Sequence, residues 1–362
     1  MMGRAHFIMV DKKKMLFVVE AFGGGVFTYI VELANALVDE FEVHIAYSVR
    51  EQTPDDFKSY FKDDIKLIEV QNFCREINPV KDIKALKELK EIEKRIKPDI
   101  IHLHSSKAGV LGRILFGFGK VPVFYTPHGY SFLMEDQSAL KVAVFKAIER
   151  VCGFTKCMTI SCSEGEHRET LKLTKKAQYV SNGINIQEVQ AIIDEVEKKD
   201  HPFTVFTLGR ICYQKNPALF NEIAENMPDT KFIWIGDGEL RDELNSSNIA
   251  IAGWLDRKSA IEIAVNADVF VLTSLWEGLP ISLLEAMYMG KKCVVSDVIG
   301  NNDVIKNGVN GWVCKSNAEF VNAIKNTGFA VVENARKDVL DNYNVDVMVE
   351  KYRGIYKNPI GC

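Results

Sequence analysis

Short apolar runs alternate along the chain with longer stretches in which apolar residues recur at helical spacing. In the first half, the apolar runs predict strands and the amphipathic stretches predict helices at 26–40, 81–97 and 138–151. The strands are expected at 15–22, 42–47, 65–70, 99–104, 123–128 and 156–163. Because these runs are apolar without strict alternation, they favour a parallel sheet covered by helices on both faces.

The alternation pauses between residues 186 and 202, where the chain is polar and charged and ends in a proline, so we predict a linker there. A second series of strands follows at 203–210, 231–238, 248–254, 268–274, 291–297 and 311–315. The sequence therefore predicts an α/β protein with two doubly wound Rossmann-like domains, residues 1–185 and 203–340, facing each other across a cleft. Residues 343–358 are expected to form a helix that returns to the first domain.

Composition narrows the possible partners. The 362 residues include 45 Lys and Arg against 49 Asp and Glu, a formal charge of −4, so no overall basic field favours nucleic acid. The start of the chain has a short apolar stretch interrupted by charges at 11–14, which is typical of neither an export signal nor a membrane span. We expect a cytoplasmic protein whose Cys152, Cys157 and Cys162 are buried thiols rather than metal ligands.

The segment WEGLPISLLEAMYMG (276–290) is the strongest local signal. Pro280 and Gly290 bracket a predicted helix of about three turns, with Pro280 at its first position. Glu285 lies among apolar neighbours, where a carboxylate requires partners, and the vicinal hydroxyls of a sugar would provide them. Pairing with a nearby Lys or Arg is the alternative. Glu277 precedes the helix in a loop at the end of a strand, where ligand contacts are common.

The segment LGRICYQKNP (208–217) follows the first strand of the second domain. Arg210 and Lys215 lie in a loop before a helix that Asn216 would cap and Pro217 would begin. Two cations beside a helix amino terminus favour a diphosphate site. Two solvated surface cations are the alternative for this pair taken alone.

Two further signals fall in the first domain. Gly23, Gly24 and Gly25 follow the first strand, where glycines permit close approach of a phosphate or sugar; a tight structural turn is the alternative. A dinucleotide-binding fingerprint is not supported, because Thr28 stands where a small residue is expected. His128 ends a strand before Gly129, so its imidazole is expected to point into the cleft, with a core histidine as the alternative.

Three further features of the sequence give weaker indications of function. Gly253 and Trp254 follow a strand in the second domain and are either ligand contacts or turn residues. His102 and His104 share one strand face, but no third ligand stands near them, so we predict no metal site. Segments 108–120 and 139–151 combine wide apolar faces with Lys or Arg, and are either membrane-surface helices or core helices with solvated cations.

These motifs together resemble the retaining glycosyltransferases of family 4, which have the GT-B fold. The glycine loop, the His-Gly pair, the Arg-x(4)-Lys pair and Glu277-x(7)-Glu285 occur in that family's order. The resemblance implies that Arg210 and Lys215 hold the donor's phosphates, Glu277 and His128 lie at the donor sugar, and Glu285 binds the ribose hydroxyls. Other expected donor contacts are Gly24, Gly25, Gly253, Trp254, Gly278, Leu279 and Pro280.

The resemblance also implies an activity. We expect transfer, with retention, of a hexosyl or N-acetylhexosaminyl group from a nucleotide sugar, UDP-linked in preference to GDP-linked, without cofactor or metal. The expected acceptor is a glycan, lipid-linked in capsule, exopolysaccharide or O-antigen synthesis, with peripheral contact at the inner membrane face. A nucleotide-sugar epimerase of related fold and a non-catalytic sugar-binding protein are the alternatives.

Overall fold

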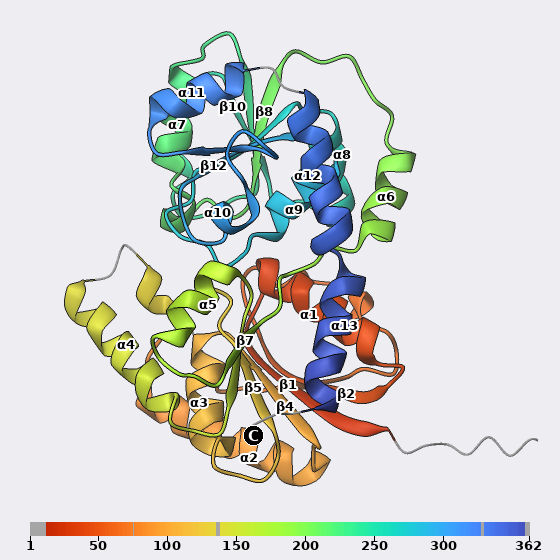
Figure 1. Ribbon diagram of the computed structural model, residues 1–362, viewed down its shortest axis with the longest axis vertical. Coiled ribbons are helices and arrows are strands. Elements are labelled where there is room, and N and C mark those ends of the chain that lie inside the picture. Colours follow the sequence, from red (N-terminus) through yellow and green to blue (C-terminus); the bar gives the residue numbers. More distant parts are fainter. Residues whose placement is uncertain (1–11, 75, 135–137, 327–328, 359–362) are drawn as a thin grey trace, which may run out of the picture.

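Two parallel sheets, each covered by helices, lie one above the other in the computed structural model (Figure 1). The structure describes residues 12–358 except 75, 135–137 and 327–328. The seven-stranded sheet has the order β3-β2-β1-β4-β5-β6-β7, and the six-stranded sheet the order β10-β9-β8-β11-β12-β13. We call the parts built on them the first and second domains.

The strands of the first domain are β1 (Lys13–Phe22), β2 (Phe41–Val49), β3 (Lys66–Glu69), β4 (Ile100–His104), β5 (Val123–Thr126), β6 (Met158–Ser161) and β7 (Ala177–Tyr179). Those of the second are β8 (Thr204–Leu208), β9 (Lys231–Ile235), β10 (Ile249–Gly253), β11 (Val269–Leu272), β12 (Lys292–Ser296) and β13 (Trp312–Cys314). Both sheets are therefore doubly wound from a central first strand, as the apolar runs predict.

Helices cover both faces of each sheet. Helices α1 (Gly24–Leu37) and α13 (Val345–Lys357) cover one face of the first sheet, and α2 (Pro79–Ile96) and α3 (Ser106–Phe116) cover the other. In the second domain, one face carries α6 (Ile186–Glu195), α8 (Arg257–Val265), α9 (Ile281–Tyr288) and α12 (Phe329–Asn342), and the other carries α7 (Pro217–Glu225) and α11 (Asn317–Lys325). The remaining helices are α4 (Ala139–Cys152), α5 (Glu164–Leu171) and α10 (Asn301–Val304).

The chain passes between the domains at two adjacent points. Beside Ile184, the backbone from Tyr343 to Val345 returns from the second domain and forms hydrogen bonds of 3.0 Å in both directions. Helix α13 then packs against α1 in the first domain (Figure 1). Its Tyr352 and Tyr356 are buried in the same core as Phe17, so the first domain contains a helix that follows the second in sequence.

Three local expectations differ from the structure. Residues 186–195 of the predicted linker form α6, because Val189 and its apolar neighbours one turn away pack into the second domain. Helix α9 has eight residues rather than three turns, and Pro280 is its N-cap, with extended backbone at ψ 122°, rather than its first helical residue. The short strand β7, only partly buried, lies outside the predicted strands.

Candidate active site

An ion pair joins two of the predicted motifs. Lys215 Nζ lies 2.5 Å from Glu277 Oε1, and Ser274 Oγ donates to the same oxygen at 2.6 Å. Both charged side chains are largely buried, so the carboxylate remains paired where its desolvation would otherwise be costly. The loops after β8 and β11 are thus joined at neighbouring strand ends, because β8 and β11 pair in the sheet.

Arg210 lies in the loop after β8, as predicted, and its side chain is more accessible to solvent than that of Lys215. Its Nε donates to Glu239 at 3.0 Å, and its side chain is 28% exposed. This loop packs tightly on the loop after β9: a methyl group added at Gly236 would lie 2.1 Å from the Gly209 carbonyl oxygen. The glycine at position 236 therefore permits the close approach that fixes the backbone beside Arg210.

The Asn216 cap follows the sequence prediction. Its side chain accepts from the Leu219 backbone N–H, and Pro217 begins α7. Thr273, at the end of β11, donates to the Lys215 carbonyl at 2.7 Å, which ties the cation loop to the neighbouring strand. The Lys215 side chain therefore extends from a loop of fixed conformation, directly before the amino terminus of α7. Helix amino termini are suited to binding anions.

Glu285 is buried and has a protein partner. Arg257 Nη2 lies 2.9 Å from Glu285 Oε1, and the same guanidinium lies 3.5 Å from Glu188 Oε1. Burial raises the pKa of Glu285, although Arg257 opposes the shift. The pairing with an arginine that the sequence left as an alternative is therefore present, and Arg257, the first residue of α8, was not among the predicted site residues.

The pair His128-Gly129 meets the second domain through its backbone. His128 has a φ of +55° and Gly129 a φ of +93°. A methyl group added at Gly278 would lie 3.0 Å from the Gly129 nitrogen and from Cys162 Sγ. The two loops therefore touch, and His128 holds a left-handed conformation that is uncommon for a non-glycine residue.

The His128 ring packs inward among other rings. Its Nε2 lies 3.1 Å from His104 Nδ1, and the Tyr29 ring meets it edge to face at 4.7 Å between centroids. Burial lowers the pKa of His128 to about 3, so the imidazole is neutral near pH 7. His102 and His104 share one face of β4 as predicted. His102 hydrogen-bonds to Tyr356 and Thr126, so His102 and His104, both fully buried, form part of the core beneath the site, whereas His128 is half-buried at its edge.

Glu166, which the sequence analysis missed, supports this loop. Its carboxylate accepts from the Gly129 backbone N–H at 2.7 Å and from the Cys162 backbone N–H at 2.8 Å. Ser163 and Glu166 have the spacing of a capping box, which is the one local signal that marked this position. That pattern predicts a helix start, and gives no indication that Glu166 reaches the His128 turn.

The glycines expected to contact the donor lie in two places. Gly24 begins α1 with a φ of +54° and open space on its Cβ side, while a methyl group at Gly25 would lie 3.9 Å from Ile281 of α9. The glycine loop therefore faces the helix that carries Glu285. Gly253 has a φ of +75° and Trp254 is 55% exposed, so that loop is open to solvent.

Two further hydrogen bonds cross between the domains. Asn182 Nδ2 donates to the Leu279 carbonyl at 2.7 Å, beside Pro280. Asp303 accepts from the Gly165 backbone N–H at 2.9 Å, at the start of α5, and pairs with Arg168. The loops that carry Gly25, Gly129 and Gly278 thus meet at one boundary, where the carboxyl ends of both sheets lie.

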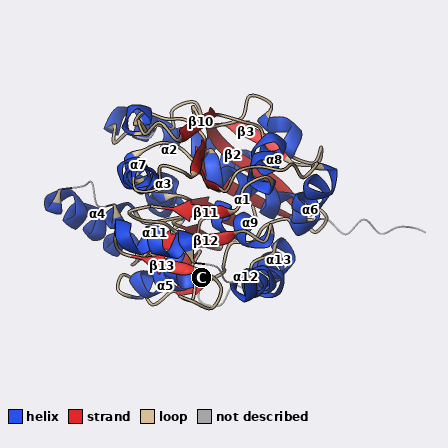
Figure 2. Cartoon of the chain, turned by 90° about the horizontal axis from the view of Figure 1, so that it is seen from above, coloured by secondary structure: helices blue, strands red, loops and turns tan. Residues whose placement is uncertain are grey.

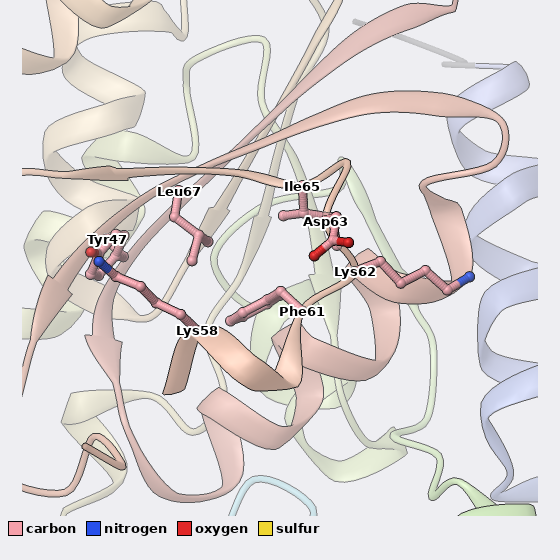
Figure 3. Close-up of a pocket in the computed structure, with 7 residues that line it drawn as sticks. All are labelled: Tyr47, Lys58, Phe61, Lys62, Asp63, Ile65 and Leu67. Atoms are coloured by element: carbon pink, nitrogen blue, oxygen red, sulfur yellow. The ribbon is translucent and has the colours of Figure 1, made fainter. Parts of the chain in front are cut away.

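A hollow of about 280 Å³ lies elsewhere in the first domain, between β2, β3 and the short helix η1 (Phe57–Tyr60) (Figure 3). Its lining combines Lys58, Lys62 and Asp63 with apolar side chains, and includes none of the predicted site residues. Among the described residues, no group of three His, Cys, Asp or Glu side chains is arranged to hold a metal ion.

Comparison with known proteins follows the same division of the chain. A model described as Glycosyltransferase Family 4 matches residues 23–188, and one described as Glycosyl transferases group 1 matches residues 188–327. A UDP-Gal:alpha-D-GlcNAc-diphosphoundecaprenol alpha-1,3-galactosyltransferase of Escherichia coli is 32% identical over 333 residues, 82% of this chain and 85% of that protein. The chain belongs to glycosyltransferase family 4.

A second curated relative agrees with this membership, and two solved structures share the fold. An N,N'-diacetylbacillosaminyl-diphospho-undecaprenol alpha-1,3-N-acetylgalactosaminyltransferase of Campylobacter jejuni is 27% identical over 327 residues, 80% of this chain and 85% of that protein. Sucrose-phosphate synthase of Thermosynechococcus elongatus superposes with a TM-score of 0.81 at 15% identity, covering 96% of this chain and 99% of that one. The structure of Anabaena HepE in complex with UDP and glucose superposes with a TM-score of 0.74 at 16% identity, covering 96% of this chain and 100% of that one.

Family 4 membership and the GT-B fold are therefore confirmed, and this chain is a glycosyltransferase of the hexosyl-transferring type. That conclusion favours the transferase over the epimerase and the sugar-binding protein that the sequence left open.

Proposed function

We propose that this family 4 enzyme transfers a hexosyl or N-acetylhexosaminyl residue from a UDP-linked sugar to a hydroxyl of a lipid-linked glycan. The names of the two relatives support this, because both specify sugars linked to undecaprenol through diphosphate, and one names UDP-Gal as the donor. The structural observation that carries the proposal is the Lys215–Glu277 pair beside Arg210, at the boundary where the domains meet. Capsule, exopolysaccharide or O-antigen synthesis is the setting we infer.

Each side chain of the site would have a separate role in binding the donor or in breaking its bond to the diphosphate. Lys215 and Arg210 would bind the donor diphosphate and stabilise the charge that develops as the bond from sugar C1 to the phosphate oxygen breaks. Glu277 would orient the donor sugar, with His128 beside it. Because Lys215 contacts Glu277, one cation couples the sugar-binding carboxylate to the phosphate-binding loop. Glu285 would accept from the ribose hydroxyls through the oxygen that Arg257 leaves available.

We propose retention, by front-face attack. The acceptor oxygen forms its bond to C1 on the face that the diphosphate leaves, and its proton passes to the departing phosphate. Lys215 and Arg210 supply the positive charge that a divalent ion provides in other transferases, so we propose a metal-independent reaction.

A lipid-linked acceptor is anchored in a membrane, so the enzyme must reach the membrane surface. We propose that it binds peripherally at the cytoplasmic face of the membrane. Within the described residues, every helix is too short or too polar to cross a bilayer.

The test combines binding with product analysis. Calorimetry would compare UDP, GDP and ADP, and transfer from UDP-Gal, UDP-GalNAc, UDP-Glc and UDP-GlcNAc to an undecaprenyl-diphosphate-linked GlcNAc would follow, with and without EDTA. We expect selective UDP binding, an α-linked product by NMR and no effect of EDTA. Unchanged turnover in Arg210→Ala would overturn the proposed phosphate site, and a β-linked product would overturn retention.

A further inference from the structure

Helix α4 carries apolar side chains on a face that no other part of the described chain covers. Its inward residues, including Val142 and Phe145, pack on the core of the first domain. Its outward face nevertheless presents Leu140, Val144 and Val151, which are 76%, 45% and 66% exposed. These positions repeat at helical spacing, so they form a stripe along the helix. In both Figure 1 and Figure 2, α4 lies at the outer edge of the molecule.

Neighbouring segments extend the stripe. Phe154 after α4 is 78% exposed, and Ile114 and Phe118 at the end of α3 are 58% and 70% exposed. Helices α3 and α4 are in contact, and the six side chains lie on these two helices or within two residues of their ends. We call this set the α3–α4 surface. Large exposed apolar residues gathered on neighbouring segments are unusual on a monomer and mark an interaction site.

The exposed charges on helices α3 and α4 themselves have a single sign. Helix α3 contains no Asp or Glu, and the one acid of α4, Glu149, is buried against Arg113 Nη2 at 2.7 Å. The exposed cations of these segments are Lys120, Lys141, Lys146, Arg150 and Lys156. Apolar side chains flanked by Lys and Arg, on two helices that carry no exposed carboxylate, match the composition of a surface that lies in the headgroup region of an anionic bilayer.

Position relative to the site supports the same occupant. Helix α4 packs against η2 (Ser131–Leu133), which begins two residues after Gly129 of the domain boundary. A second copy of the chain fits poorly, because a two-fold contact would place five exposed cations against the same five. We propose that the α3–α4 surface docks the first domain on an anionic phospholipid bilayer and thereby presents the site to a membrane-borne acceptor; the second clause rests on the proposed function.

The experiment measures vesicle binding by the full chain, separately from activity. Sedimentation would compare binding to vesicles of phosphatidylcholine mixed with anionic phosphatidylglycerol and binding to vesicles of pure phosphatidylcholine. Leu140→Glu/Val144→Glu is expected to reduce partitioning at least about tenfold. Val309→Glu/Leu340→Glu is the matched control, because it adds the same charges at side chains 50% and 45% exposed in the second domain. It is expected to bind as the wild type does.

A second variant and a solution measurement complete the test. Lys141→Gln/Lys146→Gln/Arg150→Gln should lose the preference for anionic vesicles, as should the wild type in high salt. Equal binding by the wild type and the Leu140→Glu/Val144→Glu variant would overturn the proposal. So would a wild-type dimer that this variant converts to monomer without any change in vesicle binding. Transfer to a water-soluble short-chain acceptor separates the questions: its absence in wild type that binds vesicles would contradict the proposed acceptor and leave docking intact.

Discussion

The Glu166 carboxylate accepts a hydrogen bond from the Gly129 backbone N–H at 2.7 Å, and this bond holds the turn in which His128 adopts a left-handed conformation. A second bond, from the Cys162 backbone N–H, fixes the other carboxylate oxygen. A buried acid whose two oxygens both bind backbone thus sets the shape of a loop at the domain boundary. Its distance in sequence from that loop explains why no local pattern revealed it.

Glu166→Gln tests this relationship. The amide group places an N–H donor against one of the two backbone donors, so we expect a loss of about 1–3 kcal/mol in the free energy of unfolding. Displacement of the His128 turn should lower kcat by about ten- to a hundredfold. Glu164→Gln, on the same helix with a largely exposed side chain, is the control and should change neither. A normal kcat in Glu166→Gln would show that the turn keeps its shape without the carboxylate.

Lys215→Met and Arg210→Ala should separate stability from catalysis. Lys215 neutralises the buried Glu277, so its removal should cost about 3–5 kcal/mol of folding free energy as well as activity. Arg210 pairs with a largely exposed Glu239, so its removal should cost less than about 1 kcal/mol. Both should lower kcat/KM by about a hundred- to a thousandfold. Denaturant melts, and initial rates with the donor that the transfer assay selects, would check this contrast. Equal stability losses would contradict it.

Gly278→Ala should hold the domains apart. The added methyl group would lie 3.0 Å from both the Gly129 nitrogen and Cys162 Sγ, and the first of these is backbone. We expect a fall in kcat/KM of about tenfold or more, measured with saturating acceptor, because the loops at the domain boundary must separate. Gly354→Ala in α13 meets no atom within 4 Å and is the control. It should raise stability by about 0.5–1 kcal/mol and leave the rate unchanged.

Stability should depend on the ionisation of Glu32 in α1. Burial, opposed mainly by Arg257, raises its pKa from 4.5 to about 7, and nearby Glu188 adds to the shift. The folded state therefore binds a proton that the unfolded chain releases between pH 4.5 and 7. This contribution is fully present below pH 4.5 and is lost as pH rises through about 7.

Glu32→Gln should remove that dependence. The amide keeps an oxygen to accept from Asn185 Nδ2 and carries no charge. Thermal melts should show that the variant gains at most about 3 kcal/mol in free energy of unfolding over the wild type at pH 8. The change at pH 5 should be smaller. An equal shift at the two pH values would indicate a packing effect instead.

Sequence patterns identified much of this molecule because the relevant interactions are local. The Arg210–Lys215 loop could be predicted because Asn216 and Pro217 mark the helix that follows, and both occupy the expected positions. Glu277 could be placed beside that loop because parallel strands end at a common edge.

The remaining partners depend on tertiary contacts. Arg257 begins α8 and has the sequence context of a surface cation, yet it lies against Glu285 from another helix. Val189 lies in a polar segment, and only its burial against the second domain explains helix α6. The outward stripe of α4 has the same apolar periodicity as its inward face, and side-chain exposure distinguishes the two.

The return of α13 to the first domain has a consequence for biosynthesis. A ribosome that has completed the first 200 residues has made every strand of the seven-stranded sheet, but the core over one face still lacks Met348, Val349, Tyr352 and Tyr356. Native packing there must wait until the whole second domain has been translated. The nascent first domain therefore exposes apolar surface along α1 for the interval in which the second is made, and the two domains cannot mature strictly in the order of their synthesis.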